Sequence, residues 1–398
     1  MIIQVLGTVV AILLVFIIVQ IARKPPARSK VSGVKLPPGI IFRWMPRIIF
    51  EIESFILRRI LPLETAAMKV LSQQQMLGIL NACHQLRVWD AIHALENDEE
   101  LPTPTSIANK VHVPDVSGIK CMLDYLVAQR FLTPGYRLTP FTEGMRQGGC
   151  LEGLFTVMGP LFQQMPNIAP ALKQGRKPFS YTHNTTFFEL CKKQPIYSHA
   201  FDQMMTTTQA APALAAAIDF PFWYKYNSIV DIGGGSGTLS LELASRTSRL
   251  DQRFIVCDQA QLCDACTNDP RISSHPFDFF DTNATLPDAD CYVLKNVLHN
   301  WSDAGCQTIL QKITPMLADN SKVLIIIDLV LPPTTKRTDP LMPQKYSYNF
   351  AMFATFLGKE RNLADWSRLL ADAGLEIVDL HNTRSLNSVL RCRRSPHS

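Results

Sequence analysis

A glycine-rich stretch carries the first pattern in this sequence that could do chemistry. Residues 227–237 read NSIVDIGGGSG, in which a short β-branched run is followed at once by glycines. Such a run is typical of a buried strand, and the glycines would end it abruptly. A helix is predicted next, at Thr238–Arg246. Ligands of doubly wound α/β domains bind beyond the carboxyl ends of the strands, where glycine lets the backbone come close. The stretch therefore predicts a site for a nucleotide-like ligand.

The turn differs from the GxGxxG fingerprint of dinucleotide-binding proteins. Gly235-Ser236-Gly237 is followed by Thr238, Leu239 and Ser240, so the third glycine is missing. A second strand is predicted at Phe254–Cys257, and it ends at Asp258. A carboxylate in that position can accept hydrogen bonds from ribose hydroxyls. The pattern indicates an adenosine-containing cofactor and leaves a dinucleotide and S-adenosylmethionine both open.

A histidine follows the next predicted strand, Cys291–Leu294. His299 could act as a general base, because imidazole titrates near neutral pH. A lone histidine is more often a structural residue, so this role needs support from its surroundings. A further aliphatic strand is predicted at Val323–Leu329, and it contains Asp328.

Three motifs in order resemble those of class I O-methyltransferases of the plant caffeate and acetylserotonin (hydroxyindole) type. They are DIGGGSG at 231–237, LPDADCYVLKNVLHNWSDAGC at 286–306 and GKER at 358–361. The resemblance covers roughly Glu64 to Arg391, and YSYNFAMFATFLGKERN is closest to the acetylserotonin branch. It implies S-adenosylmethionine as the cofactor, with Asp281 competing with Asp278 for the adenosine. The cofactor-binding residues that it implies are Gly233, Gly235, Gly237, Asp258, Asp278, Phe279 and Lys295.

The same resemblance implies the catalytic residues. His299 would be the general base, with Asp328 and Glu360 as the flanking carboxylates, and a small hydroxyl compound, aromatic or lipophilic, would be the methyl acceptor. No metal is expected. The chain departs from the family pattern at Asn300, where an acid is common, and at Asp328, where a glutamate is usual. Two alternatives stay open: a cofactor-binding relative that hydroxylates or decarboxylates, and a non-enzymatic interaction module.

The expected fold class is α/β, with a Rossmann-like S-adenosylmethionine methyltransferase domain at 227–398. A winged-helix-like dimerisation domain is expected at 64–150, built on helices at Pro104–Lys110 and Val116–Arg130, and the resemblance implies a homodimer. A mainly helical connection at 151–226 would line the substrate pocket.

The distribution of charge argues against nucleic acid as a partner. The net charge is +5, but residues 1–62 contain nine basic and two acidic residues, and the remaining 336 contain 30 basic and 32 acidic ones. A basic footprint is therefore absent from the part expected to be globular. Among ten cysteines only Cys263 and Cys266 form a CxxC pair, and a single pair is weak evidence for zinc.

The positive charge lies beside an apolar run. Residues 2–22 are almost entirely aliphatic, and at 1.5 Å per residue they would span about 31 Å, the thickness of a bilayer's hydrocarbon core. The sequence thus predicts a transmembrane anchor at 1–23, followed by a basic, proline-rich linker with a possible interfacial helix at 24–63. Because the cations follow the span, the catalytic domain is expected on the cytoplasmic side of a membrane such as the endoplasmic reticulum.

Overall fold

The computed structural model describes residues 27–37, 39–259, 269–319, 321–334, 339 and 341–396. The chain divides into two compact units: residues up to 51 together with 208–398, and residues 52–207. The predicted anchor at 1–23 and the pair Cys263 and Cys266 lie outside the described residues. No helix within the described ranges combines the length and the hydropathy needed to cross a bilayer.

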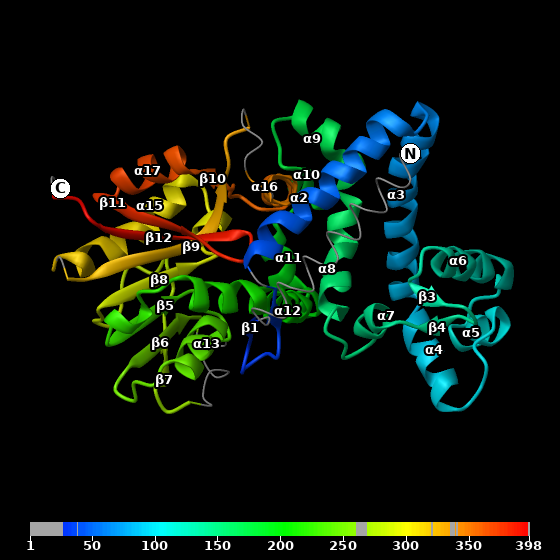
Figure 1. Ribbon diagram of the computed structural model, residues 1–398, viewed down its shortest axis with the longest axis horizontal. Helices are drawn as coiled ribbons and strands as arrows, with labels where there is room; N and C mark the ends of the chain where they lie inside the picture. The colour runs from blue at the N-terminus through cyan, green and yellow to red at the C-terminus, as the bar shows by residue number, and fades with distance from the viewer. Residues whose placement is uncertain are drawn as a thin grey trace. The chain divides into compact units, whose positions relative to one another are not determined.

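The first unit is built on a twisted, mainly parallel sheet (Figure 1). The strand order is β11-β12-β9-β8-β5-β6-β7, and β10 pairs with β9. Strand β12 is antiparallel to both of its neighbours, whereas β5 to β9 run parallel. The strands are β5 (Ser228–Ile232), β6 (Arg253–Asp258), β7 (Ile272–Pro276), β8 (Cys291–Lys295), β9 (Val323–Leu331), β10 (Arg361–Asn362), β11 (Leu375–Asn382) and β12 (Asn387–Arg394).

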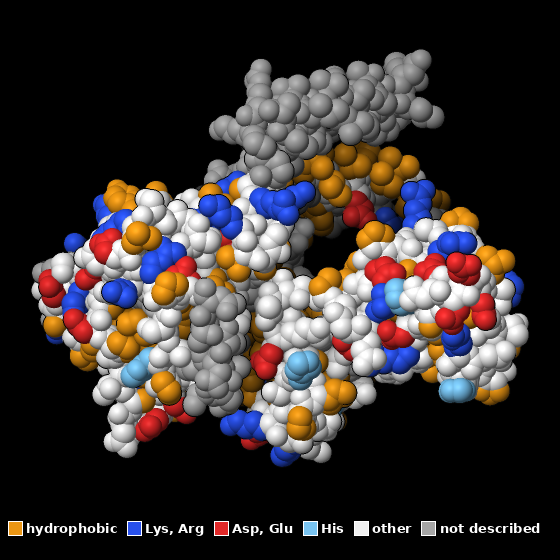
Figure 2. Space-filling view, turned by 90° about the horizontal axis from the view of Figure 1, so that it is seen from below, with side chains coloured by type: hydrophobic (Ala, Val, Ile, Leu, Met, Phe, Trp, Pro, Cys, Tyr) orange, Lys and Arg blue, Asp and Glu red, His pale blue; other side chains and the backbone are white. Residues whose placement is uncertain are grey.

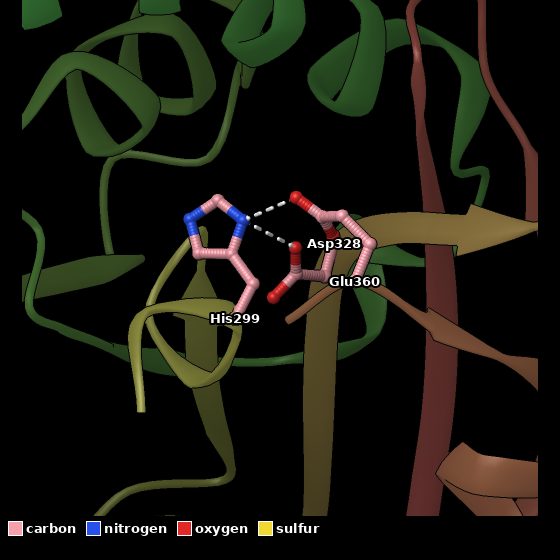
Figure 3. A group of neighbouring side chains, drawn as sticks. All are labelled: His299, Asp328 and Glu360. Carbon is pink, nitrogen blue, oxygen red and sulfur yellow. Dashed lines mark hydrogen bonds and ion pairs between the residues drawn. The ribbon is translucent and has the colours of Figure 1, made fainter. Parts of the chain in front are cut away.

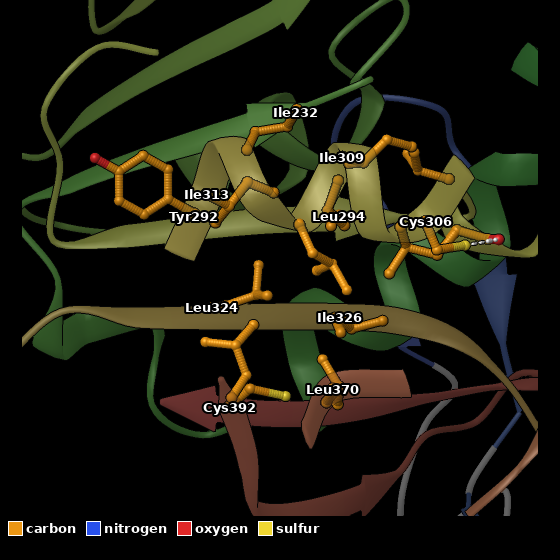
Figure 4. Packing of buried hydrophobic residues seen from close by; sticks show 14 of the residues in the cluster. Ile232, Tyr292, Leu294, Cys306, Ile309, Ile313, Leu324, Ile326, Leu370 and Cys392 are labelled. Atoms are coloured by element: carbon orange, nitrogen blue, oxygen red, sulfur yellow. Dashed lines mark hydrogen bonds between the residues drawn. The ribbon is translucent and has the colours of Figure 1, made fainter. Parts of the chain in front are cut away.

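The central strands are mostly apolar because both faces of the sheet are covered. Leu324 and Ile326 of β9 pack with Ile309 and Leu370 from the helices on one face (Figure 4). Alternate residues of the same strand, such as Ile325, join the cluster on the other face. The covering helices are α12 (Pro195–Asp219, of which residues from 208 belong to this unit), α13 (Thr238–Arg246), α15 (Asp303–Ile313) and α17 (Leu363–Ala371). A further helix, α16 (Met342–Thr355), contacts the end of β9, where Lys345 donates to the carbonyl oxygen of Val330.

Several boundaries differ from the sequence-based prediction. The strand predicted at Val323–Leu329 extends to Leu331, where Arg361 and Asn362 pair with it as β10, and α17 begins directly after this pair, at Leu363. Helix α15 ends at Ile313 and continues as a 3-10 turn, η5 (Thr314–Leu317), where Pro315 cannot donate a backbone hydrogen bond. Strand β7 was not predicted. The other 3-10 turns of this unit are η3 (Trp223–Lys225) and η4 (Leu298–Asn300), and an N-terminal hairpin comprises β1 (Ala27–Arg28) and β2 (Lys35–Leu36).

The second unit is mainly helical. The helices α5 (Pro104–Lys110) and α6 (Val116–Ala128) are followed by a small hairpin, β3 (Leu132–Thr133) and β4 (Arg137–Leu138). Its other elements are the π-helix η1 (Ile56–Ile60), α3 (Leu63–Gln85), α4 (Val88–Asn97), α7 (Pro140–Gly144), α8 (Glu152–Gln163), η2 (Met165–Asn167), α9 (Ile168–Lys173), α10 (Pro178–His183) and α11 (Phe187–Lys193), and α2 (Gly39–Phe55) precedes them. Acidic and basic side chains are interspersed on the face that Figure 2 shows.

Candidate active site

The glycine turn begins where β5 ends, and its backbone requires glycine. Gly233 has φ +71° and donates its N–H to the carbonyl oxygen of Cys257, at 2.7 Å. A Cβ at Gly233 would lie 2.8 Å from Cγ2 of Val297 and 3.1 Å from Cζ of Phe279. Gly235 and Gly237 also have positive φ, of +56° and +70°. Any side chain at Gly233 would therefore displace the residues packed on the turn.

Asp258, at the end of β6, closes on this turn. Its carboxylate accepts the N–H of Gly235 at 2.8 Å and the N–H of Gln259 at 2.7 Å. Burial raises the pKa of Asp258. A Cβ at Gly235 would meet no atom of the described residues within 4 Å, so none of these residues covers the backbone that Asp258 holds. The turn thus offers the bare backbone and the adjacent carboxylate that an adenosine-containing ligand needs.

The residues after β7 approach the turn from one side. Phe279 packs against Gly233, as the distance above shows, and its ring centroid lies 5.9 Å from that of Phe277. Asp278 and Asp281 are both exposed, and each accepts a backbone N–H two residues further on, at 2.8 Å and 2.9 Å. Phe279 is thus part of the turn's surroundings, and each aspartate holds the backbone of its own loop.

Lys295 lies at the carboxyl end of β8, next to the glycine turn in the sheet. Its Nζ donates to Oε1 of Gln209 in α12, at 2.9 Å. Burial lowers the pKa of Lys295 to about 8, although the charges of Asp231 and Asp328 oppose this shift. The ammonium group of Lys295 is therefore held by an uncharged side chain, and it loses its proton at a lower pH than an ordinary lysine does.

An amide network beside Lys295 escaped the sequence analysis. Oε1 of Gln209 also accepts the side-chain amide of Asn296, and Nδ2 of Asn387 donates to Oδ1 of Asn296 at 2.7 Å. Asn296 has φ +54°, a conformation that asparagine tolerates better than most residues. Gln209 belongs to α12, Asn296 follows β8 and Asn387 begins β12. Of the three, only Asn296 lies in a motif that the sequence showed, the stretch 286–306.

The structure brings His299, Asp328 and Glu360 together (Figure 3). Nδ1 of His299 lies 2.9 Å from Oε1 of Glu360 and 3.3 Å from Oδ1 of Asp328. His299 stands in η4, Asp328 in β9 and Glu360 just before β10. The imidazole is 15% exposed, whereas both carboxylates are buried. Because both carboxylates approach Nδ1, the other ring nitrogen, Nε2, points away from them.

The two carboxylates make this histidine strongly basic. Burial by itself would lower the pKa of His299, but the charges of Asp328 and Glu360 outweigh it and raise this pKa to about 9. Burial also raises the pKa of Asp328, to about 6. Oδ2 of Asp328 and Oε2 of Glu360 have no hydrogen-bond partner among the described residues. The group is therefore arranged to hold a proton on the imidazole.

Within the described ranges, the same three residues could also hold a metal cation. One potential ligand atom of each residue lies within 4.8 Å of the other two. Nδ1 already contacts one carboxylate oxygen of Asp328 and one of Glu360. A cation there would have to replace those contacts, whereas a proton is accommodated by them as they stand.

The segment 358–361 holds the backbone of the histidine as well as its ring. A Cβ at Gly358 would lie 1.8 Å from the carbonyl oxygen of His299. Arg361, which is fully buried, donates to the carbonyl oxygens of Leu298 at 3.1 Å and Trp301 at 3.2 Å, on either side of the histidine. It also donates to Oδ1 of Asp303 at 2.7 Å. Gly358 and Arg361 stand in the GKER motif, which by itself indicated no role for either residue.

The side chain of Asn300, one of the two departures from the family pattern, binds the backbone of its own loop. Its Nδ2 donates to the backbone carbonyl oxygen of Asn296 at 3.1 Å. Asp328, the other departure, still reaches Nδ1 of His299 although its side chain is shorter than glutamate.

Comparison with known proteins identifies the family. Residues 166–376, more than half of the chain, match the model of the O-methyltransferase domain. A 3-O-methylredipecamine 2-O-methyltransferase from Carapichea ipecacuanha is 30% identical over 217 residues, which are 53% of this chain and 59% of that protein. A demethylsterigmatocystin 6-O-methyltransferase from Emericella nidulans is 34% identical over 152 residues, 38% of this chain and 71% of that protein. The chain thus aligns with 59% and 62% of the first two curated relatives' lengths.

Solved structures agree in fold. Human N-acetylserotonin methyltransferase, in complex with S-adenosylmethionine, superimposes with a TM-score of 0.68 at 20% identity, covering 85% of this chain and 99% of that one. The mitomycin 7-O-methyltransferase gives a TM-score of 0.65 at 18% identity, covering 83% and 99%. The predicted Rossmann-like methyltransferase fold with a helical N-terminal region is therefore confirmed. By its sequence match and by this fold, the chain belongs to the O-methyltransferase domain family.

Proposed function

We propose that this protein is an S-adenosylmethionine-dependent O-methyltransferase that methylates a hydroxyl group of a small aromatic or lipophilic compound. The observation that carries the proposal is the contact of His299 Nδ1 with Glu360 and Asp328, at 2.9 Å and 3.3 Å. This contact lies at the carboxyl edge of the sheet, at the end of the strand beside the glycine turn. A general base and a nucleotide-type site thus share one edge.

The residues at this edge fit the cofactor. The backbone of Gly235, which none of the described residues covers, and the contact of its N–H with Asp258 match the needs of an adenosine, and Lys295, Phe279 and Gly233 complete the same wall. Gly237 opens α13, and Asp278 lies on the loop that carries Phe279. S-adenosylmethionine, when bound, supplies an electrophilic methyl group on a sulfonium.

His299 would take the proton of the acceptor on Nε2 while Glu360 and Asp328 hold Nδ1–H and stabilise the imidazolium. A phenol has a pKa near 10, so an ordinary imidazole at about 6.5 would accept its proton at a cost of roughly 5 kcal/mol. With the pKa of His299 raised to about 9, the cost falls to about 1.4 kcal/mol. This match supports a phenolic hydroxyl as the acceptor. A positioned base contributes about 10²- to 10⁴-fold.

The test is transfer of labelled methyl from S-adenosylmethionine to a panel of phenols, with His299→Ala as the comparison. Transfer that the substitution abolishes supports the proposal. Tight cofactor binding without transfer to any acceptor would instead favour a relative with altered chemistry. Binding of a macromolecule without measurable cofactor affinity would favour an interaction module.

We also propose that residues 1–23 anchor the protein in a membrane, with the catalytic domain on the cytoplasmic side, and that the chain is a homodimer. The aliphatic run at 2–22 and the cations after it support the anchor. Resistance to alkaline extraction tests the anchor, and protease digestion of intact microsomes tests the orientation, because a protected catalytic domain would contradict it. Sedimentation in detergent tests the dimer.

A further inference from the structure

The hairpin formed by residues 27–36 has one face held by the catalytic unit. Leu36 is buried against Leu214 and Ala215 of α12. Ser29, also buried, donates its hydroxyl hydrogen to the carboxylate of Glu242 in α13. In addition, Arg246 of α13 donates to the carbonyl oxygen of Arg28, at 2.8 Å. The hairpin is therefore a fixed part of the catalytic unit, beside α13 (Figure 1).

The exposed side of the hairpin is cationic. Arg28, Lys30 and Lys35 are all exposed, and Nζ of Lys30 also donates to the carbonyl oxygen of Ser245 in α13, at 3.5 Å. Arg28 and Lys35 are direct cross-strand partners, so their side chains leave the same face of the hairpin. Like charges in that arrangement repel each other, and none of the three cations forms an ion pair with a carboxylate in the described part of the chain. The arrangement favours an anionic partner outside the chain.

The position of the hairpin in the chain indicates which partner this is. Residues 1–50 contain no Asp or Glu. Four residues separate the end of the apolar run 2–22 from Ala27, the first residue that the structure describes. Those four residues, 23–26, span at most roughly 14 Å when extended. If residues 2–22 cross a bilayer, as proposed above, the hairpin must lie close to the lipid headgroups. The cytoplasmic leaflet is rich in anionic lipids, which attract Lys and Arg near the surface.

We propose that Arg28, Lys30 and Lys35 form a lipid-binding surface that rests on the anionic headgroups of the membrane. The hairpin would thereby hold the catalytic unit in a fixed orientation on the bilayer, with α13 next to the headgroups. This inference rests on the proposed anchor and is independent of methyl transfer.

The experiment uses the full chain in bilayer nanodiscs and a photoreactive benzoylphenylalanine in place of Val31, at the tip of the hairpin. Val31 is 44% exposed, and Val378 on β11, at 41%, provides a matched control position. We expect cross-links to lipid from position 31 and few from position 378. Cross-linking should increase when phosphatidylserine is added to phosphatidylcholine and decrease with salt.

Charge is tested by the triple variant Arg28→Gln, Lys30→Gln, Lys35→Gln, in which each lost cation should weaken the contact roughly fivefold. The control is Lys173→Gln, Lys192→Gln, Lys193→Gln, at exposed lysines of the other unit. Thermal unfolding checks that both variants are folded. The proposal is overturned if position 31 cross-links to another copy of the chain instead of lipid, or if neither lipid charge nor the triple variant changes the yield. An inactive enzyme that still cross-links to lipid would contradict only the proposed function.

Discussion

Gly358 lies against the peptide bond that follows His299, so close that a Cβ would be 1.8 Å from the histidine's carbonyl oxygen and 2.6 Å from the carbonyl carbon of Asn300. The distance is far below any real contact, and the atoms concerned are backbone. The position of His299 along its loop is therefore set by the absence of a side chain at Gly358, whereas the orientation of its ring is set by Glu360, two residues later.

Gly358→Ala should move the histidine loop. Displacements of about 1 Å at a reacting group can lower the rate about 10²-fold, and overpacking costs typically 1 to 3 kcal/mol of stability. We expect a loss of kcat of that order, measured with the best phenol at saturating cofactor, together with a lower Tm. Gly78→Ala, in α3, is the control, because a Cβ there would meet nothing within 4 Å. Wild-type kcat in Gly358→Ala would show that the loop is not held at this point.

Arg361→Lys should impair the enzyme although the charge is kept. A lysine cannot reach the carbonyl oxygens of Leu298 and Trp301 together with Asp303 as the guanidinium does. A buried carbonyl left without a donor costs about 1 to 3 kcal/mol, so unfolding by urea should show a loss in that range. Because Arg361 holds the backbone on both sides of His299, the same substitution should also change the pKa of His299, which NMR can follow. Arg368→Lys, at an exposed arginine paired with Asp365, should change neither quantity.

His299→Ala should abolish methyl transfer and spare cofactor binding. The ring contacts Asp328 and Glu360 rather than the glycine turn, so calorimetric titration with S-adenosylmethionine should give a Kd within a few fold of the wild type. The rate should fall by about 10²- to 10⁴-fold. His112→Ala, at a loop position of the other unit, serves as the control. If His299→Ala transferred methyl at the wild-type rate, the base would have to be another group.

Activity should rise with pH towards about 9. The pKa of His299 is raised to about 9, so the imidazole is protonated below that pH and cannot accept the acceptor's proton. Glu360→Gln removes one negative charge and keeps an acceptor for Nδ1–H, so the acidic limb of the kcat profile should move to lower pH. A profile that is identical in the variant would contradict the role of Glu360.

The same shift links stability to pH. The pKa of His299 is higher in the folded state than its unfolded value of about 6.5. Its contribution to the free energy of unfolding is therefore fully present below pH 6.5 and is lost as the pH rises through about 9. The raised pKa of Asp328, about 6, acts in the same direction at lower pH. Urea unfolding of wild type and Glu360→Gln across this range should show a smaller loss in the variant.

The parts of the fold that sequence predicted well are those with a strong local signal. The strands β5, β6, β8 and β9 are mostly apolar because they are buried by helices, and the glycines mark the turn after β5. Strand β7 reads ISSHP, with one buried residue, Ile272, and it exists because it pairs with β6. Pairing between distant segments leaves no period in the sequence.

The site divides in the same way. Sequence motifs and the family resemblance pointed to His299, Asp328 and Glu360. The contact among the three side chains depends on the order of the strands in the sheet. The bonds from Gln209 to Lys295 and Asn296 span 86 and 87 positions and involve amides that no pattern distinguishes from surface residues. The contact of Gly358 with the histidine loop depends on how two loops pack, which local sequence does not encode.

The position of β12 has a consequence for synthesis. β12 lies between β9 and β11, and its Ser388 is the direct partner of Asp328. While a ribosome is still producing residues 332–386, β9 has an open edge and Asp328 lacks its neighbouring strand. The nascent chain must therefore keep a long aliphatic edge from pairing with other chains until its last strand emerges. Such a chain is expected to depend on chaperones during translation, and truncations before Asn387 should yield insoluble protein rather than a weak enzyme.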